Sequence, residues 1–512
     1  MGSEFKVVRG GRLLDVSTRS AIQHDLLIEE GKIIEIDLPE MSVPDGAAEV
    51  NAKGMMLMPG LINAHTHGHG SLGKGLGERW TLEHLLHAGP WINGHRTLED
   101  KRLSTKLNAA EMVLKGCTAT YDLYFEFPAP TLEGMHAVAM GYADVGVRST
   151  IAPMMADHTL YTAIPELLAV FPDSAQKQLS QIRAAPAREI LKACAALLID
   201  WPYDLRRTKL ALAPTIPLHC SDEFLIGCRY LALEHEVGLH MHLSESRIQV
   251  VSGLERYGKT LTAYLDDVGM LSPRFTGAHC VWLDNDDVKR LADNGCSVAH
   301  NPGSNLRLGN GIAPARRMLA DGVNVGIGTD GSQCSDHQNM FEAMRLASFV
   351  SRVVTPDTEG WLETAEVVAM ATRGSAEALG FGDSIGRLEP GARADIVFLD
   401  LTNINFVPLN DPVNQIVHTE DSSAVHSVMV DGDFILENRQ FTMIDYEKLC
   451  RDAESASERL LAANADTRAF AASLDTYVSK FCVGLAHRPY HIHRWAGEQP
   501  AVRSVEESDL KQ

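Results

Sequence analysis

Four short segments place metal-binding or acid–base side chains directly after a run of apolar residues. The segments are PGLINAHTH with His65 and His67, GLHMHLSE with His240, His242 and Glu245, TGAHC with His279, and GIGTDGS with Asp330. Imidazole nitrogens and carboxylate oxygens are ligands that divalent metals such as zinc accept. A further carboxylate beside a bound water can carry protons. The pattern therefore indicates a metal site with an acid–base group.

Each segment alone is also compatible with a buried polar residue that is simply satisfied in the core. Residues i and i+2 of a regular strand point the same way, so sharing of one metal by His65 and His67 predicts an irregular strand end. The spacing does not decide whether His69 and His240 bind metal, although His240 should lie deeper in the barrel than His242. Asp330, if buried at a strand end, needs a cation or another partner.

The elements that must position these residues follow a regular rhythm. Eight apolar runs, most of them followed by a helical stretch, are MLMPGLINAH, CTATYDL, VRSTIAP, LALAPT, GLHMHL, FTGAHC, CSVAHN and VNVGIGTD. This alternation predicts an α/β fold with a (β/α)8 TIM-type barrel over residues 55–385. Polar residues stand at the carboxyl ends of most runs, where barrel enzymes carry their chemistry.

Other segments flank or interrupt the barrel. Alternating apolar residues in 6–54 and 386–444 predict two parts of one small β-sandwich, with a hairpin turn at Asp431-Gly432-Asp433. An insertion at about 157–207 predicts helices broken by Pro165, Pro172 and Pro186, as a lid or a dimer contact. Residues 445–512 predict a helical tail. Met1 to Phe5 resemble translated cloning linker.

Composition narrows the class of protein. The 512 residues include 46 Lys plus Arg against 67 Asp plus Glu, a formal net charge of -21. Such a surface repels nucleic acids and anionic membranes, so we expect neither as a partner. The nine cysteines form no CxxC pair, and neither a signal peptide nor a membrane span is recognisable. We therefore expect a cytoplasmic enzyme for a small molecule, assembled as a homo-oligomer (dimer or higher).

The motifs together resemble the amidohydrolase superfamily, specifically its group of chlorotriazine hydrolases and purine- or pterin-type deaminases. PGLINAHTH, HLSE, GAHC, VAHNPGSNLRLGNGIAP, GIGTDG and SIGRLEPGARADIVFLDL follow the order of that group across nearly the whole chain. The resemblance implies the metal ligands His65, His67, His242 and Asp330. It implies the catalytic residues Glu245, His279 and Asp330: Glu245 to shuttle protons, His279 to hold the attacking water or polarise the substrate, and Asp330 as an alternative acceptor of the water proton.

Two positions bear on how the resemblance is interpreted. Members with two metals carry a bridging lysine at the end of strand four, whereas Lys209 lies at the opposite end of that strand, so we expect one metal ion. Zn²⁺ suits three imidazoles and a carboxylate, with Fe²⁺, Co²⁺ or Mn²⁺ as alternatives. Many deaminases of the group have a histidine where this chain has Thr215, with His219 four residues later.

The predicted activity is cleavage of a C–N bond, other than a peptide bond, by a metal-activated water. Two readings remain open: deamination of an N-heterocycle, and hydrolysis of an amide or urea, which Thr215 favours slightly. Hydrolytic dechlorination of a chlorotriazine-like ring is an alternative, and a non-catalytic binding or assembly barrel is a third. Asn305, His158 and Trp91 are candidate substrate contacts. Identification of the products separates the enzyme readings.

Overall fold

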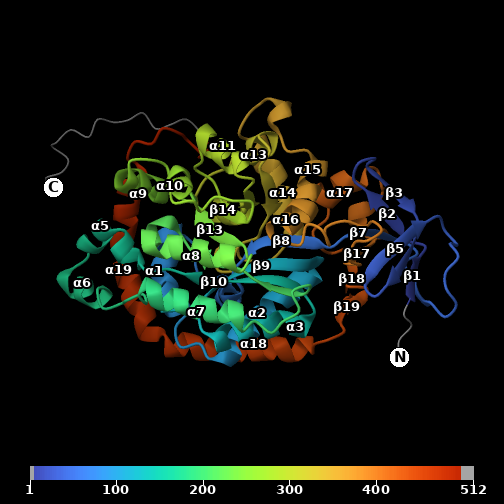
Figure 1. Cartoon of the computed structure of the whole chain (residues 1–512), viewed down its shortest axis with the longest axis horizontal. Helices are drawn as coiled ribbons and strands as arrows, with labels where there is room; N and C mark the ends of the chain where they lie inside the picture. The colour runs from blue at the N-terminus through green and yellow to red at the C-terminus, as the bar shows by residue number, and fades with distance from the viewer. Residues whose placement is uncertain (1–4, 497–512) are drawn as a thin grey trace.

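The structure, a computed structural model, describes residues 5–496 of the chain. It is an α/β protein in which helices surround a central set of parallel strands, with a smaller β region at one end (Figure 1). Of the expected linker, residues 1–4 lie outside the described range, but Phe5 already pairs with Glu29 in a strand. Within residues 5–496, every helix is too short or too polar to cross a lipid bilayer.

The central strands form two parallel sheets, ordered β8-β9-β10-β11 and β13-β14-β15-β16, with β12 also paired to β10. They are β8 (Leu61–Thr66), β9 (Cys117–Phe125), β10 (Arg148–Met155), β11 (Thr208–Leu210), β12 (Ala213–Pro214), β13 (Leu239–Leu243), β14 (Phe275–His279), β15 (Ser297–His300) and β16 (Asn324–Ile327). Most of their residues are buried, which explains why the apolar runs are continuous rather than alternating. The fourth predicted strand is split between β11 and β12.

Hydrogen bonds link the two sheets at both edges. Leu212 forms a parallel bridge with Leu239, and the amide of His240 donates to Leu212 O at 2.9 Å. At the other edge, the amide of Asp330 donates to His65 O at 2.9 Å. The second contact brings the first and last predicted metal ligands together.

Helices follow the strands and cover their outer faces. They are α1 (Leu82–Ile92), α2 (Leu98–Leu114), α3 (Leu132–Val145), α8 (Asp222–Glu234), α9 (Arg247–Tyr257), α10 (Leu261–Asp267), α11 (Asn285–Asp293), α12 (Pro302–Arg307), α13 (Ala315–Ala320), α14 (Met340–Arg352), α15 (Thr364–Ala369) and α16 (Ser375–Ala378). Short 3-10 or π turns occur at Gly68–Gly73, Pro217–His219, Thr358–Gly360 and Met370–Gly374. Side-chain N-caps start several helices: Thr97 begins α2 and Ser246 begins α9.

The smaller β region combines both ends of the sequence. One sheet has the order β5-β4-β1-β6, and the other has the order β20-β19-β18-β17-β7-β2-β3. The strands are β1 (Phe5–Arg9), β2 (Arg12–Asp15), β3 (Ser20–Gln23), β4 (Asp25–Glu29), β5 (Lys32–Asp37), β6 (Ala48–Asn51), β7 (Met55–Pro59), β17 (Ile396–Asp400), β18 (Val425–Val430), β19 (Asp433–Glu437) and β20 (Gln440–Phe441). Helix α17 (Pro412–His418) and a turn at Ile404–Phe406 join β17 to β18.

Residues from the two distant segments share one sheet and one apolar cluster, which includes Val8, Leu26, Ile396 and Met429. The hairpin turn predicted before Asp433 is confirmed, because Asp431 and Gly432 both have positive φ between β18 and β19, as a two-residue type I′ turn requires. Residues 55–59, which we expected in the barrel, form β7 of this sheet instead.

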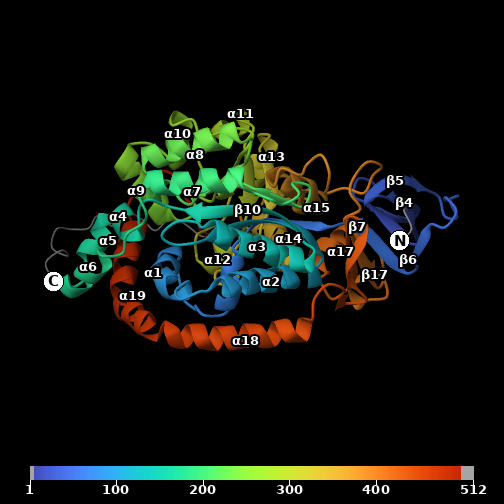
Figure 2. The ribbon, with the colours of Figure 1, turned by 60° about the horizontal axis from the view of Figure 1, so that its bottom comes forward.

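The insertion and the tail both add helices outside the central strands. The insertion forms α4 (Leu160–Ala163), α5 (Pro165–Ala169), α6 (Asp173–Leu179) and α7 (Ala187–Ile199), and each predicted proline stands at a helix start. The tail forms α18 (Tyr446–Ala463), which runs along α2, and α19 (Ala465–Ala486), which packs on α1 and α9 (Figure 2). Residues 487–496 are not helical, and the rest of the predicted helical tail lies outside the described residues.

Candidate metal centre

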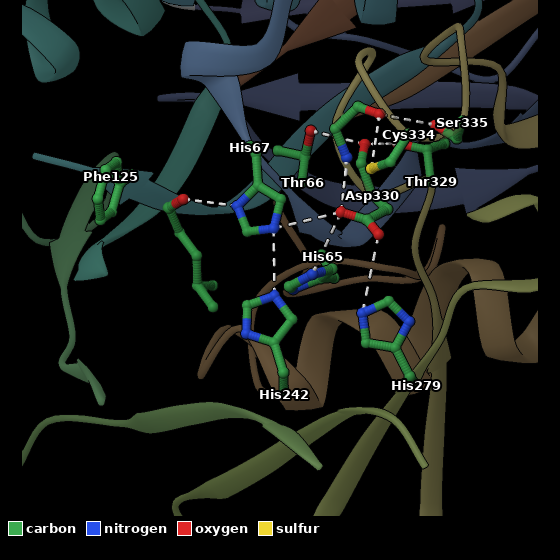
Figure 3. Close-up of polar contacts among 12 residues, drawn as sticks. His65, Thr66, His67, Phe125, His242, His279, Thr329, Asp330, Cys334 and Ser335 are labelled. Atoms are coloured by element: carbon green, nitrogen blue, oxygen red, sulfur yellow. Dashed lines mark hydrogen bonds and ion pairs between the residues drawn. The ribbon is translucent and has the colours of Figure 1, made fainter. Parts of the chain in front are cut away.

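The structure brings the histidines and the aspartate predicted from the motifs into one buried cluster. His65 and His67 come from the end of β8, His242 from β13 and His279 from the end of β14, while Asp330 follows β16. Figure 3 shows the rings of His65, His67 and His279 next to the Asp330 carboxylate, with the His242 ring facing His67. The pairing of β8 with β9 shifts register between Asn63 and Thr66, which confirms the irregular strand end predicted for the HxH pair.

The ring nitrogens and the carboxylate approach one another closely. His67 Nε2 lies 3.2 Å from His242 Nε2 and 3.2 Å from Asp330 Oδ1. His65 Nε2 lies 3.6 Å from the same carboxylate oxygen. Two overlapping groups have ligand atoms near enough to share an ion: one of His65, His67 and His242, the other of His65, His279 and Asp330.

Backbone carbonyls determine which ring nitrogens carry protons. His67 Nδ1 lies 2.7 Å from Leu123 O, and His242 Nδ1 lies 2.9 Å from Thr215 O. A carbonyl can only accept, so each Nδ1 is the donor, and the Nε2 atom of each ring is left to bind a cation. The pKa of His242 is lowered to about 3, by burial and by the neighbouring His67 and His279, which keeps that ring neutral.

His67 Nε2, His242 Nε2 and the Asp330 carboxylate therefore lie together as possible ligand atoms. His65 adds a buried ring, neither of whose nitrogens has a hydrogen-bond partner among the described residues. Burial alone would raise the pKa of Asp330, but His67 and His279 lower it, so the carboxylate remains ionised. Converging lone pairs around a buried anion require a cation, and three imidazoles with one carboxylate are a donor set that suits zinc. The residues fit a single divalent metal.

His279 and Glu245 stand beside this donor set. His279 Nε2 lies 3.6 Å from Glu245 Oε2 and 3.7 Å from Asp330 Oδ2. Burial, and then the negative charges of Asp330 and Glu83, raise the pKa of Glu245 well above its ordinary value. A carboxyl group with a raised pKa, near both a nucleophile site and an imidazole, is suited to accept and return a proton.

Two asparagines form hydrogen bonds with His279 and Glu245. Asn305 Oδ1 lies 2.9 Å from His279 Nδ1, so the amide oxygen accepts a hydrogen bond from Nδ1–H, and Nε2 is free to face the cluster. Asn305, a candidate substrate contact in the sequence analysis, thus contacts His279 directly. Asn310 Nδ2 donates to Glu245 Oε1 at 3.0 Å. The sequence analysis gave Asn310 no role, although it lies within the VAHNPGSNLRLGNGIAP motif.

The remaining histidines near the motifs lie outside the two ligand groups. His69 Nδ1 accepts the amide of Phe125 at 3.2 Å. His240 is buried deeper and packs against Tyr121 and His65, as the strand alternation suggested. Lys209 donates to Gly380 O and lies over the ring of Phe381, so no contact of Lys209 in the described structure involves the ligand cluster.

The other two candidate substrate contacts, His158 and Trp91, have described contacts with residues outside the ligand cluster. The amide of His158 donates to His219 O at 3.0 Å, and burial, with His158 and Arg256 nearby, lowers the pKa of His219 to about 4. Trp91 packs edge-on against Trp80 and beneath Arg468 of α19. The described contacts of Trp91 therefore place it in the interface of α1 with the tail.

Comparisons with known proteins agree with this geometry. Residues 56–435 match the pattern of the Amidohydrolase family. The chain is 30% identical over 465 residues to the 5'-deoxyadenosine deaminase of Methanothermobacter thermautotrophicus. The aligned region covers 90% of this chain and 100% of that protein.

Two solved structures resemble the whole fold. An adenosine deaminase from Xanthomonas campestris with bound zinc has a TM-score of 0.78 at 27% identity and covers 89% of this chain and 98% of its own. An atrazine chlorohydrolase from Arthrobacter aurescens complexed with zinc also has a TM-score of 0.78, at 28% identity, and covers 88% of this chain and 99% of its own. The matched span and the full-length relatives show that this chain belongs to the amidohydrolase family.

Proposed function

We propose that the protein deaminates an N-heterocycle hydrolytically, with one divalent metal, Zn²⁺, held by His65, His67, His242 and Asp330. The observation that carries the proposal is the set of converging lone pairs on Asp330, with Glu245 and His279 at its edge. The deaminase and zinc-bound relatives support both the reaction and the metal.

The side chains then have distinct parts in the reaction. A divalent metal lowers the pKa of bound water to near 7 and so supplies a nucleophile at neutral pH. Glu245 accepts a proton from the attacking water and returns it to the ring or leaving nitrogen as ammonia departs. His279 presents Nε2 as an acceptor that can hold the attacking water, in the orientation that Asn305 sets.

The architecture supports a site of this kind. We propose that the two parallel sheets are halves of one closed (β/α)8 barrel, supported by the hydrogen bonds at Leu212 and at Asp330. The site then lies at the carboxyl ends of the strands, where barrel enzymes place theirs. We also propose that the protein is cytoplasmic, which is consistent with nine free cysteines of which eight are buried. We further propose that it is a homo-oligomer. Light scattering on the purified protein tests the oligomeric state.

Hydrolytic dechlorination is a second candidate, because the atrazine chlorohydrolase is as similar in fold as the adenosine deaminase. Both reactions add water to a ring carbon and differ in the group that leaves. The Thr215 carbonyl holds the His242 ring in this structure, and that contact favours neither reaction.

The products of the reaction test this proposal directly. Metal-replete protein is incubated with amino-heterocycles, chlorotriazines and aryl amides or ureas in water labelled with a heavy oxygen isotope. We expect the label on an intact ring, with one ammonia released per turnover. Chloride release would favour the second candidate. Products cut at an amide or urea bond, or no turnover at full metal loading, would contradict the proposal.

A further inference from the structure

A cavity of about 380 Å³ adjoins Glu245, and the proposed mechanism does not use it. Its size falls at the small end of pockets that bind drug-sized molecules. The walls come from the starts of α1 and α9, the loop after α12 and the second half of α19. Glu83, Ser246 and Asn310 are among the lining residues, together with Cys482 of the tail.

The cavity is connected to the catalytic region by two of these residues. Asn310 donates to Glu245 Oε1 at 3.0 Å, and Ser246 follows Glu245 in the chain. Ser246 Oγ accepts the amide of Gln249 as the N-cap of α9 and donates to Glu83 Oε1 at 2.9 Å. This chain of contacts fixes the position of the Glu83 carboxylate relative to Glu245.

Glu83 is a buried carboxylate with one oxygen unused. Only 2% of the residue is exposed, and Oε2 has no hydrogen-bond partner among the described residues. An acidic residue in the first turn of a helix stabilises the helix dipole, but it does so equally well from the surface. A buried carboxylate oxygen without a donor costs free energy unless a ligand completes it.

None of the basic side chains that line the cavity (Arg79, His84, Arg247 and His487) forms an ion pair with Glu83 in the described part of the chain. Arg247 donates to Arg488 O at 2.9 Å, and its guanidinium lies 5.2 Å from the rings of both Trp282 and Trp495. His84 is engaged by Ser479 Oγ at 2.9 Å. Within residues 5–496, no salt bridge includes Glu83. The free oxygen therefore remains available to a donor that enters the cavity.

We propose that Glu83 binds an N–H group of the substrate, and that the substrate is an N-heterocycle with a second amino group remote from the reacting carbon. This inference rests on the proposed deamination and names its substrate class. The reacting carbon lies at the metal centre, and the second donor reaches past Glu245 and Asn310 to Glu83 Oε2. Burial raises the pKa of Glu83, so the gain in affinity from this hydrogen bond runs from roughly threefold for a neutral carboxyl to roughly a hundredfold for an ionised one.

Matched ligand pairs test the inference. Adenine is compared with diaminopurine, aminopyrimidine with diaminopyrimidine, and aminotriazine with diaminotriazine. Affinity is measured by calorimetry on metal-replete Glu245→Gln protein, so that turnover does not interfere, and kcat/KM is measured on the protein with Glu245 intact. We expect at least one diamino ligand to exceed its partner by roughly three- to hundredfold in both measurements.

Substitutions of Glu83 must remove this preference. Glu83→Gln keeps the size but loses the charge and should remove most of it, whereas Glu83→Met has no acceptor and should remove all of it. Glu420→Gln changes another fully buried glutamate, next to Ala424 and Asn405 and outside the cavity, and should leave the preference unchanged. Metal content should be the same in all variants.

The outcomes separate this inference from the proposed function. Turnover of amino-heterocycles without a diamino preference, or with one that survives Glu83→Met, would overturn the Glu83 site while leaving deamination intact. A Glu83-dependent preference in binding, without deamination of any ligand, would support the site and refute the function. Absence of measurable binding by every pair would overturn the site.

Discussion

Two backbone carbonyls fix the chemistry of the metal centre at the scale of single residues. Leu123 O and Thr215 O each accept from the Nδ1 of a histidine, so that His67 Nε2 and His242 Nε2 both point into the ligand cluster. The motifs predicted which residues would meet. They did not predict the carbonyl partners, because those contacts join atoms that lie 27 and 56 positions apart in the chain.

Substitution of Glu245 separates metal binding from proton transfer. Glu245→Gln preserves the side-chain size and removes the exchangeable proton, so we expect metal content to stay and turnover to fall roughly 10²- to 10⁴-fold. His242→Ala removes a ligand and should lose both. Elemental analysis and initial rates on the same samples measure this contrast. If Glu245→Gln lost metal in proportion to activity, Glu245 would instead be a ligand or a structural residue.

Asn305 should act on the reaction only through His279. Asn305→Leu removes the acceptor of the Nδ1 proton, so the ring loses its fixed orientation and kcat should fall roughly 10- to 100-fold. Asn305→Asp retains an acceptor oxygen and should recover most of that loss. Steady-state kinetics gives kcat and KM separately, and a loss confined to KM would show a direct substrate contact instead.

At the scale of elements, the sequence predicted the strand ends and the tight turns better than the boundary between regions. Asp431-Gly432 has a turn chemistry that is visible in the residue types. In contrast, MMLMPGLINA is one continuous apolar run, and nothing local indicates that β7 joins the smaller sheet and β8 the central one. Partners far along the chain, such as Ile396 for Pro59, decide that division.

A buried ion-pair network joins the two regions. Arg148 of β10 is 1% exposed and pairs with Asp395 at 3.1 Å and with Asp431 at 2.8 Å. Arg148→Met would leave two carboxylates without this partner, and we expect the free energy of unfolding to fall by about 3–5 kcal/mol. Denaturant titration measures this loss.

A surface pair provides the control for that substitution. Arg206 pairs with Asp204, but its side chain is 78% exposed. Arg206→Met should therefore change the free energy of unfolding by no more than about 1 kcal/mol. Equal effects of the two substitutions would contradict a structural role for the buried network.

At the scale of the whole molecule, the tail forms part of the cavity beside the central strands. The sequence predicted helices in the tail, and α19 supplies a wall of the cavity beside Glu245. The apolar spacing of the tail indicated that its helices have a buried face, but it did not indicate that α19 packs on α1 and α9. The free oxygen of Glu83 was likewise invisible in the sequence, since it depends on Ser246 and the tail closing around the start of α1.

The central claim is that one metal ion per chain activates the enzyme. Metal-free protein is titrated with Zn²⁺, and bound metal and turnover of an amino-heterocycle are measured on the same samples. We predict that both rise together and reach their plateau at one equivalent per chain, because the two described ligand groups share His65 and Lys209 lies away from them. Full activity without metal, or a plateau that requires two equivalents, would contradict the account.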